Sequence, residues 1–195
     1  MIYLLRHGEI EAPPGRRFIG QVDYPLSARG RSQAEYWKAV LAGKGITSIF
    51  CSDLTRSMET ARIIAGEAGG GMNISGELRE IALGEWDGCP MQEIRDRFPE
   101  AWEERGRAID TFRTPGGESF RDLYDRVVPV FESISRSGKG NVLIAGHAGV
   151  NRMILCHVLE IPISKLFSIG QDYGALNIIE NKEDGLHVIS MNDNP

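Results

Sequence analysis

The chain has 195 residues, and its 22 basic against 27 acidic side chains give a formal net charge of -5 at pH 7. This length fits one domain, residues 1–195, which buries roughly 70% of its unfolded surface and needs neither a metal nor a disulfide for stability. The excess of acidic side chains and the lack of a basic run argue against a nucleic-acid partner. No apolar stretch approaches the ~20 residues of a membrane span.

The first predicted element is a short buried strand, Ile2 to Leu5, which ends at Arg6 and His7. This run is too short for the core of a signal peptide, so we expect a cytoplasmic protein. A second apolar run, 141–146, leads into His147 in the same way. Open α/β folds place their ligands at the carboxyl edge of a parallel sheet. We therefore expect His7 and His147 to meet across one pocket.

Two helices are predicted in the first third of the chain. One is capped by Ser27, and its apolar positions recur at spacings of three and four: Ala34, Trp37 and Leu41. The other follows the apolar run 49–51, is capped by Thr55 and is stopped by the glycines at 69–71. Its predicted apolar face consists of Met58, Ala61, Ala65 and Ala68. Alternating strands and helices are typical of a doubly wound fold.

The segment from Pro90 to Pro115 is charged and carries scattered aromatic residues, and we interpret it as a helical insertion at about 90–115 over the pocket. Such charged segments more often form a solvated face than a binding site. The pattern leaves open whether its arginines, or Arg16 and Arg17, reach an anion of the substrate. The arginines of the insertion are Arg95, Arg97, Arg105, Arg107 and Arg113.

The last third of the chain completes the predicted sheet. Apolar positions over 120–134 and 150–158 predict helices on either side of the strand that ends before His147. Two further strand-like runs within 176–189 flank an Asp184-Gly185 turn, which indicates a hairpin. The sequence thus predicts an α/β fold, a three-layer α/β/α sandwich with a mostly parallel sheet and one antiparallel edge strand.

Three cysteines, Cys51, Cys89 and Cys156, form an odd and sparse set, and two of them lie inside apolar runs. A free thiol in such a run behaves as a small apolar side chain. The cysteines therefore favour a reducing compartment, in agreement with a cytoplasmic location.

Five motifs that carry histidine, arginine or acidic residues occur in one order along the chain. They are Arg6-His7-Gly8-Glu9, the segment 52–61 with Arg56, Leu78-Arg79-Glu80 followed by 84–88, Gly116-Gly117-Glu118-Ser119, and Ala145-Gly146-His147-Ala148-Gly149. Together they resemble the histidine phosphatase superfamily, also called the phosphoglycerate mutase-like family, from Ile2 to about Ile189. A lone Arg-His-Gly would be weak support, whereas the ordered set is specific.

The resemblance implies a phosphoglycerate mutase-like fold and a role for each matching residue. His7 would be the nucleophile that takes up a phosphoryl group, with Arg6, Arg56 and His147 around the phosphate. Glu80 would be the general acid and base. The resemblance includes the loop 18–23, and the remaining substrate contacts that it implies are Gly20, Gln21 and Ala148. No metal and no cofactor are implied.

These residue types suit the hydrolysis of a phosphate ester. Attack by imidazole requires one neutral nitrogen aimed at phosphorus, while the other nitrogen donates its proton to a fixed carbonyl. Guanidinium groups of Arg6 and Arg56 can hold the phosphate oxygens, and the helix N-terminus at Thr55 is expected to add partial positive charge. A bound anion should favour the protonated form of His147. The leaving alkoxide needs a proton, which is the role assigned to Glu80.

Three other interpretations remain open at this stage. A mutase of the same fold would retain a second phosphate. A regulatory module could bind phosphate without turnover, because Ile10 and Pro13 stand where the family often has threonine and asparagine. A third interpretation makes His7, His147 and Glu80 a metal site with two histidines and one carboxylate, although the neighbouring arginines would repel a cation.

The sequence indicates a class of substrates rather than one compound. The segment 84–88 resembles the phosphatase branch, so the expected activity is metal-independent hydrolysis of a small phosphorylated metabolite. The loops lean toward the α-ribazole-5'-phosphate phosphatase group, with phosphoserine, phosphoglycerate and sugar phosphates still open. No nucleic acid or membrane is expected as a partner, and a homodimer is left open.

Overall fold

Six strands form one sheet in the part of the chain that this computed structural model describes, residues 1–66, 71–137 and 140–195. The spatial order is β3-β2-β4-β1-β5-β6. Strands β1 to β4 run parallel to one another, whereas β5 is antiparallel to both of its neighbours. The strands are β1 (Ile2–Arg6), β2 (Ile46–Cys51), β3 (Met72–Ile74), β4 (Asn141–Gly146), β5 (Leu176–Lys182) and β6 (Gly185–Asp193).

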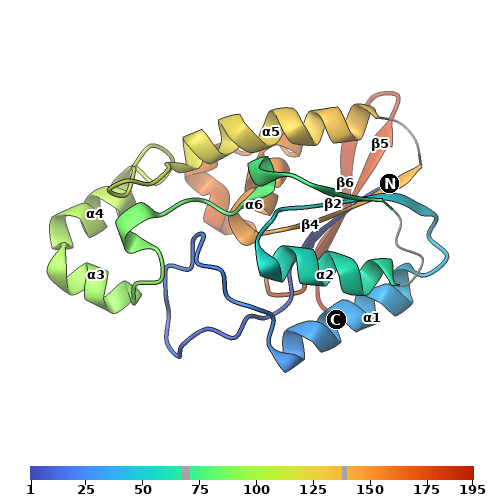
Figure 1. The fold of residues 1–195 in the computed structure, drawn as a ribbon. Coiled ribbons are helices and arrows are strands. Elements are labelled where there is room, and N and C mark those ends of the chain that lie inside the picture. Colours follow the sequence, from blue (N-terminus) through green and yellow to red (C-terminus); the bar gives the residue numbers. More distant parts are fainter. Residues whose placement is uncertain (67–70, 138–139) are drawn as a thin grey trace.

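Two pairs of helices enclose the sheet (Figure 1). One face is covered by α1 (Ala28–Leu41) and α2 (Thr55–Ala65), and the other by α5 (Phe120–Arg136) and α6 (Ala148–Val158). Side chains of β1 alternate between the two cores: Ile2 and Leu4 pack with α5 and α6, whereas Tyr3 and Leu5 pack with α1 and α2. Burial on both faces explains why these strands read as continuous apolar runs, and the predicted three-layer sandwich is confirmed.

The predicted hairpin is also confirmed. Strands β5 and β6 pair antiparallel up to Lys182 and Gly185, so the turn between them is formed by Glu183 and Asp184. Strand β5 is the one that runs opposite to the parallel strands. It lies one place in from the edge of the sheet, because β6 pairs along its outer side.

Of the two predicted N-terminal caps, one is found in the structure and the other is not. The Ser27 hydroxyl accepts a hydrogen bond from the Gly30 N–H at 3.1 Å, as expected of a cap. For α2 the cap position is Leu54, and the Asp23 carboxylate accepts from both the N–H and the hydroxyl of Thr55, at 2.8 and 2.7 Å. The predicted Thr55 cap is therefore wrong, because a loop distant in sequence supplies the acceptor.

The far end of α2 also lies earlier than predicted. The helix ends at Ala65, and Gly66 adopts a left-handed φ of 61°, which glycine tolerates without a steric penalty. Of the residues predicted to continue or stop this helix, Ala68, Gly69 and Gly70 lie outside the described ranges.

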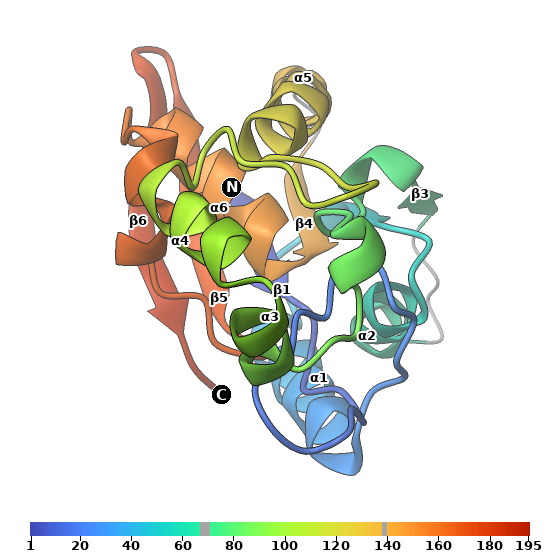
Figure 2. The ribbon, with the colours of Figure 1, turned by 90° about the vertical axis from the view of Figure 1, so that its left-hand side faces the viewer.

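The charged segment after Pro90 forms two short helices that project beyond the carboxyl ends of the parallel strands (Figures 1 and 2). They are α3 (Met91–Arg97) and α4 (Pro99–Arg107). The Trp102 ring lies 6.1 Å from that of Phe18, which itself lies 5.3 Å from Trp86. This aromatic contact fixes the segment against the loop that follows β1. The described residues also form three 3-10 helices: Gly76–Leu78, Gly84–Trp86 and Ile163–Ser168.

All three cysteines are free, and Cys51 and Cys156 are buried, as expected of small apolar side chains. Across the ranges that the structure describes, no helix is both long and apolar enough to cross a membrane.

Candidate active site

The two motif histidines lie side by side at the carboxyl edge of the sheet. Strands β1 and β4 are neighbours, and their register pairs Arg6 with Gly146, so His7 and His147 follow at the same level. Their ring centroids are 5.1 Å apart at an interplanar angle of 63°. Both side chains are buried. The expectation that two strand ends bring two imidazoles together is confirmed.

The His7 ring is held in one tautomer. Its Nδ1 lies 2.8 Å from the carbonyl oxygen of Gly8, and since a carbonyl only accepts, Nδ1 carries the proton and Nε2 keeps its lone pair. Burial, and then the nearby His147, Arg56 and Arg6, hold the pKa of His7 well below its usual value. The imidazole is therefore neutral at pH 7, with Nε2 available as a nucleophile.

A serine that the sequence did not single out fixes His147. Nε2 of His147 lies 2.7 Å from the Ser52 hydroxyl. The buried Nδ1 of the same ring has no hydrogen-bond partner among the described residues. Burial, and then Arg56 and Arg6, hold the pKa of His147 well below its usual value. The protein groups alone thus favour neutral imidazole, and the protonated form expected from the sequence requires a bound anion to offset the arginines.

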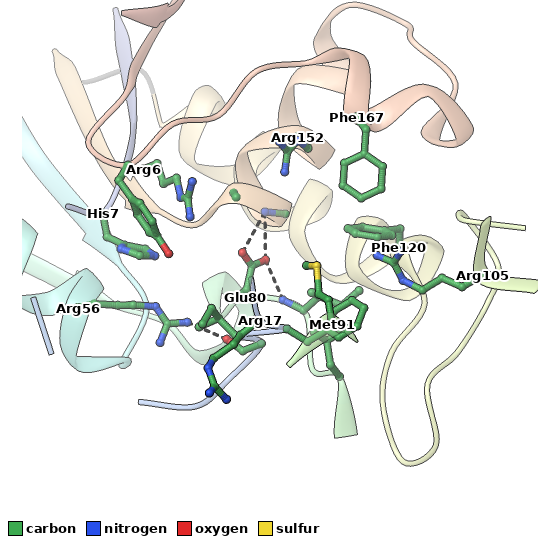
Figure 3. A pocket seen from close by; sticks show the side chains of 18 residues that line it. Arg6, His7, Arg17, Arg56, Glu80, Met91, Arg105, Phe120, Arg152 and Phe167 are labelled. Atoms are coloured by element: carbon green, nitrogen blue, oxygen red, sulfur yellow. Dashed lines mark hydrogen bonds between the residues drawn. The ribbon is translucent and has the colours of Figure 1, made fainter. Parts of the chain in front are cut away.

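Two arginines are fixed around the histidines by backbone carbonyls. The Arg56 guanidinium donates to the carbonyl oxygens of Gly20 and Val22 at 2.8 and 2.6 Å, and its side chain is fully buried. Arg6 donates to the Gln171 oxygen at 2.6 Å, and its guanidinium carbon lies 3.7 Å from the centre of the Tyr173 ring. These contacts use only part of each guanidinium, so the remaining N–H groups can bind an anion beside His7 (Figure 3).

Glu80 faces the same space from the opposite side. Its carboxylate oxygens both lie 3.1 Å from the Gly149 N–H at the start of α6, and one also accepts from the Ile81 N–H at 2.9 Å. A Cβ at position 149 would collide with that carboxylate, so the motif glycine is required for the approach. Two glutamates close to it in sequence, Glu77 and Glu85, are exposed and do not line the cavity.

One cavity of about 200 Å³ joins these groups. The predicted residues on its wall are Arg6, His7, Gly20, Arg56, Glu80 and Ala148. His147 lies behind them, against His7. Gln21 is not among the lining residues, and its side-chain amide donates to the backbone oxygen of Glu80 at 2.9 Å.

The expected contribution of the α2 N-terminus is not found either. The Thr55 N–H and hydroxyl bind Asp23, and Thr55 does not line the cavity. The positive charge at this junction therefore comes from the Arg56 side chain rather than from the helix end.

Further wall residues were not assigned a role from the sequence. Tyr173 lies on the loop before β5 and carries no local signal. Arg152 lies on α6 one turn after Ala148, a spacing that places both on one helix face. Arg17 and Arg105, which the sequence left open, also line the cavity.

The side-chain arrangement gives no support to the metal-site alternative. Within the residues that the structure describes, no three histidine, cysteine, aspartate or glutamate side chains are grouped so that they could hold a metal ion.

Replacing Arg56 with lysine should lower kcat/KM by about 100-fold, or about 2.7 kcal/mol of transition-state stabilisation. Lysine keeps the charge but cannot donate to both loop carbonyls and to an anion from one planar group. Steady-state kinetics with p-nitrophenyl phosphate, alongside an Arg62→Lys control on the same helix, measure the effect. A loss under about threefold in a folded variant would contradict a direct role for the guanidinium.

Comparison with known proteins places this site in a family. The model of the histidine phosphatase superfamily (branch 1) matches residues 2–194. Phosphoserine phosphatase 1 of Hydrogenobacter thermophilus is 29% identical over 195 residues, which cover 98% of this chain and 91% of that protein. The adenosylcobalamin/alpha-ribazole phosphatase of Escherichia coli is 28% identical over 187 residues, covering 92% and 89%.

Other relatives bear a mutase name, and the fold recurs in solved structures. A Salmonella paratyphi B protein named probable phosphoglycerate mutase GpmB is 32% identical over 163 residues, covering 83% of this chain and 75% of that protein. The structure of Bacillus stearothermophilus YhfR superposes with a TM-score of 0.90 at 31% identity, covering 98% of this chain and 96% of that one. From the match over nearly its whole length, we conclude that the chain belongs to the histidine phosphatase superfamily (branch 1).

Proposed function

We propose that this histidine phosphatase hydrolyses small phosphomonoesters through a phosphohistidine on His7, without a metal. The observation that carries the proposal is the His7 ring itself. It is neutral, its Nδ1 donates its proton to the Gly8 carbonyl, and the ring lies beside Arg6 and Arg56. A neutral imidazole with a free nitrogen next to fixed cations is suited to attack a phosphate.

The first step transfers the phosphoryl group to the enzyme. Arg6 and Arg56 bind the nonbridging oxygens, and Nε2 of His7 forms a bond to phosphorus as the bond to the leaving oxygen breaks. Glu80 lies across the cavity from His7 and donates the proton that the leaving alkoxide needs. The alcohol product leaves, and the negative charge of the ionised Glu80 remains.

The second step returns the enzyme to its starting state. Glu80 takes a proton from a water molecule, whose oxygen attacks phosphorus while the bond to Nε2 breaks. Inorganic phosphate is released and Glu80 is again protonated. His147, fixed by Ser52 behind His7, stabilises the charge on the transferred group.

Phosphate release from a panel of phosphorylated metabolites tests the proposal. The panel contains α-ribazole-5'-phosphate, phosphoserine, phosphoglycerates and sugar phosphates, and each is assayed with and without a strong chelator. We expect turnover of at least one substrate at an unchanged rate in the chelator. A protein that binds these compounds but releases no phosphate would instead support the regulatory alternative.

The mutase alternative is favoured by the relatives that carry that name. Incubation with 3-phosphoglycerate and catalytic 2,3-bisphosphoglycerate separates the two activities. We expect free phosphate from the substrate and no 2-phosphoglycerate, because water has access to the phosphohistidine. Conversion to 2-phosphoglycerate without phosphate release would overturn the hydrolase assignment.

A further inference from the structure

The cavity carries more positive charge than one phosphate requires. Five arginines line it, and among the described lining residues Glu80 supplies the one carboxylate. The lining arginines are Arg6, Arg17, Arg56, Arg105 and Arg152. A phosphomonoester brings nearly two negative charges at pH 7, so it and Glu80 together leave part of this positive charge unbalanced. In a chain with a net charge of -5, such a local excess points to a further anion.

Arg105 lies apart from the phosphate-binding arginines, whereas Arg152 lies near enough to Arg6 to be affected by its charge. Figure 3 shows His7, Arg6 and Arg56 on one side of Glu80, and Arg105 with two phenylalanine rings on the other. The guanidinium carbons of Arg105 and Arg152 lie 5.9 and 5.3 Å from the centre of the Phe167 ring. The two arginines thus flank one aromatic side chain of the cavity wall, although they come from α4 and α6.

Neither guanidinium has its donors satisfied by the protein. No carboxylate lies within ion-pair distance of Arg105 or Arg152 in the described residues. Arg152 uses only its Nε, which donates to the Ile169 oxygen at 3.0 Å, and no hydrogen bond of Arg105 to a described residue is found. Contacts with aromatic rings engage the face of a guanidinium and leave its in-plane N–H groups free.

A structural arginine of the same chain shows the contrast. Arg126 donates to both carboxylate oxygens of Glu118 at 2.9 and 2.8 Å, and also to the backbone oxygens of Glu77 and Arg79 at 2.6 and 3.1 Å. Burial lowers the pKa of Arg105, and burial followed by the charge of Arg6 lowers that of Arg152. Both side chains are half-buried, and even partial removal of a cation from water without a counter-ion is unfavourable, so both suit an anion brought by a ligand.

Arg17 is not part of this set. Its guanidinium donates to the Gly88 oxygen at 2.9 Å, and Figure 3 shows it directed away from Arg105 and Arg152.

We infer that Arg105 and Arg152 bind a second anionic group, a carboxylate or a phosphate, on the same molecule whose phosphomonoester is placed at His7. The inference rests on the proposed function and narrows its substrate class. It favours compounds such as phosphorylated hydroxy acids or bisphosphates over α-ribazole-5'-phosphate, which has no second anion. Phe120, which is buried, and Phe167, which is exposed, line the cavity beside the two guanidinium groups.

Matched ligands that differ in one anionic group test this assignment. One pair is 3-phosphoglycerate and sn-glycerol 3-phosphate, where a carboxylate replaces a hydroxymethyl group, and a second is phosphoserine and phosphoethanolamine. A third, fructose 1,6-bisphosphate and fructose 6-phosphate, examines a second phosphate. Calorimetry gives the Kd of each compound and phosphate release gives kcat/KM, so binding is measured whether or not turnover occurs.

In the wild type, at least one pair should show a preference of about tenfold or more for the compound with two anions. In Arg105→Gln and in Arg152→Gln this ratio should fall toward one, because each variant removes half of the second site. The matched control is Arg107→Gln, an exposed arginine of α4 that does not line the cavity, and it should keep the wild-type ratio. Circular dichroism and Tm confirm that each variant is folded.

Two outcomes would overturn the inference. One is a wild-type ratio under about threefold in all three pairs, and the other is a ratio that persists in both variants. If all compounds bind with the predicted preference but release no phosphate, the proposed function fails while the second anion site stands. If phosphate is released from both members of every pair at equal efficiency, the proposed function stands and the second site fails.

Discussion

Replacing His7 with alanine should lower kcat/KM for every phosphomonoester by at least about 10⁴-fold, because the variant has no nucleophile in the position of Nε2. His147 cannot substitute for it. Its Nε2 is bound to Ser52 at 2.7 Å, and its ring lies behind His7, outside the cavity wall.

Steady-state phosphate release from the variant and from His187→Ala measures the loss. His187 is an exposed histidine on β6 that pairs with Asp184, so its removal controls for the loss of an imidazole remote from the site. Activity of His7→Ala within about tenfold of the wild type, in a folded protein, would show that another group attacks phosphorus.

Replacing Glu80 with glutamine should lower kcat/KM for alkyl phosphates by about 10³-fold, equivalent to about 4 kcal/mol in the barrier. Glutamine keeps an oxygen that can accept from the Gly149 and Ile81 N–H groups, so the local structure should persist. What it loses is the proton that a poor leaving group needs in the transition state.

The dependence on the leaving group identifies this role. An aryl phosphate such as p-nitrophenyl phosphate leaves readily without a proton, so phosphorylation of His7 should survive in Glu80→Gln and the phosphorylated enzyme should accumulate. Glu77→Gln and Glu85→Gln serve as controls, since both glutamates are exposed and off the cavity wall. Equal slowing of alkyl and aryl substrates without accumulation would assign the proton transfer to another group.

The parts of this site that the sequence predicted are those that depend on strand ends. His7 and His147 each end an apolar run, and neighbouring parallel strands necessarily bring such residues to one edge. The position of Arg56 at the start of α2 was visible in the same way. Its contacts with the loop carbonyls of Gly20 and Val22 were not, because they depend on how a turn-rich segment folds back over the sheet.

Other features depend on tertiary contacts that leave no local pattern. Tyr173 reaches the cavity from a loop that has no periodicity, and the Asp23 carboxylate caps a helix that begins 32 residues later. The choice of Glu80 among nearby acids required the family resemblance. In the structure its carboxylate approaches the backbone of Gly149, where a side chain would collide with it. The exposure of Arg105 could not be predicted from the sequence of α4, because it depends on contacts of the guanidinium with the rings of Phe18 and Phe167.

The covalent intermediate is the centre of the proposed mechanism, and trapping it on the protein tests the mechanism most directly. Wild-type enzyme is quenched in alkali during turnover of a labelled substrate, and the modified residue is located by mass spectrometry. We predict label on His7 that survives alkali and is lost in acid, as expected for phosphohistidine, with none on His7→Ala. Label that resists acid, or that persists in His7→Ala, would contradict a phosphohistidine at this position.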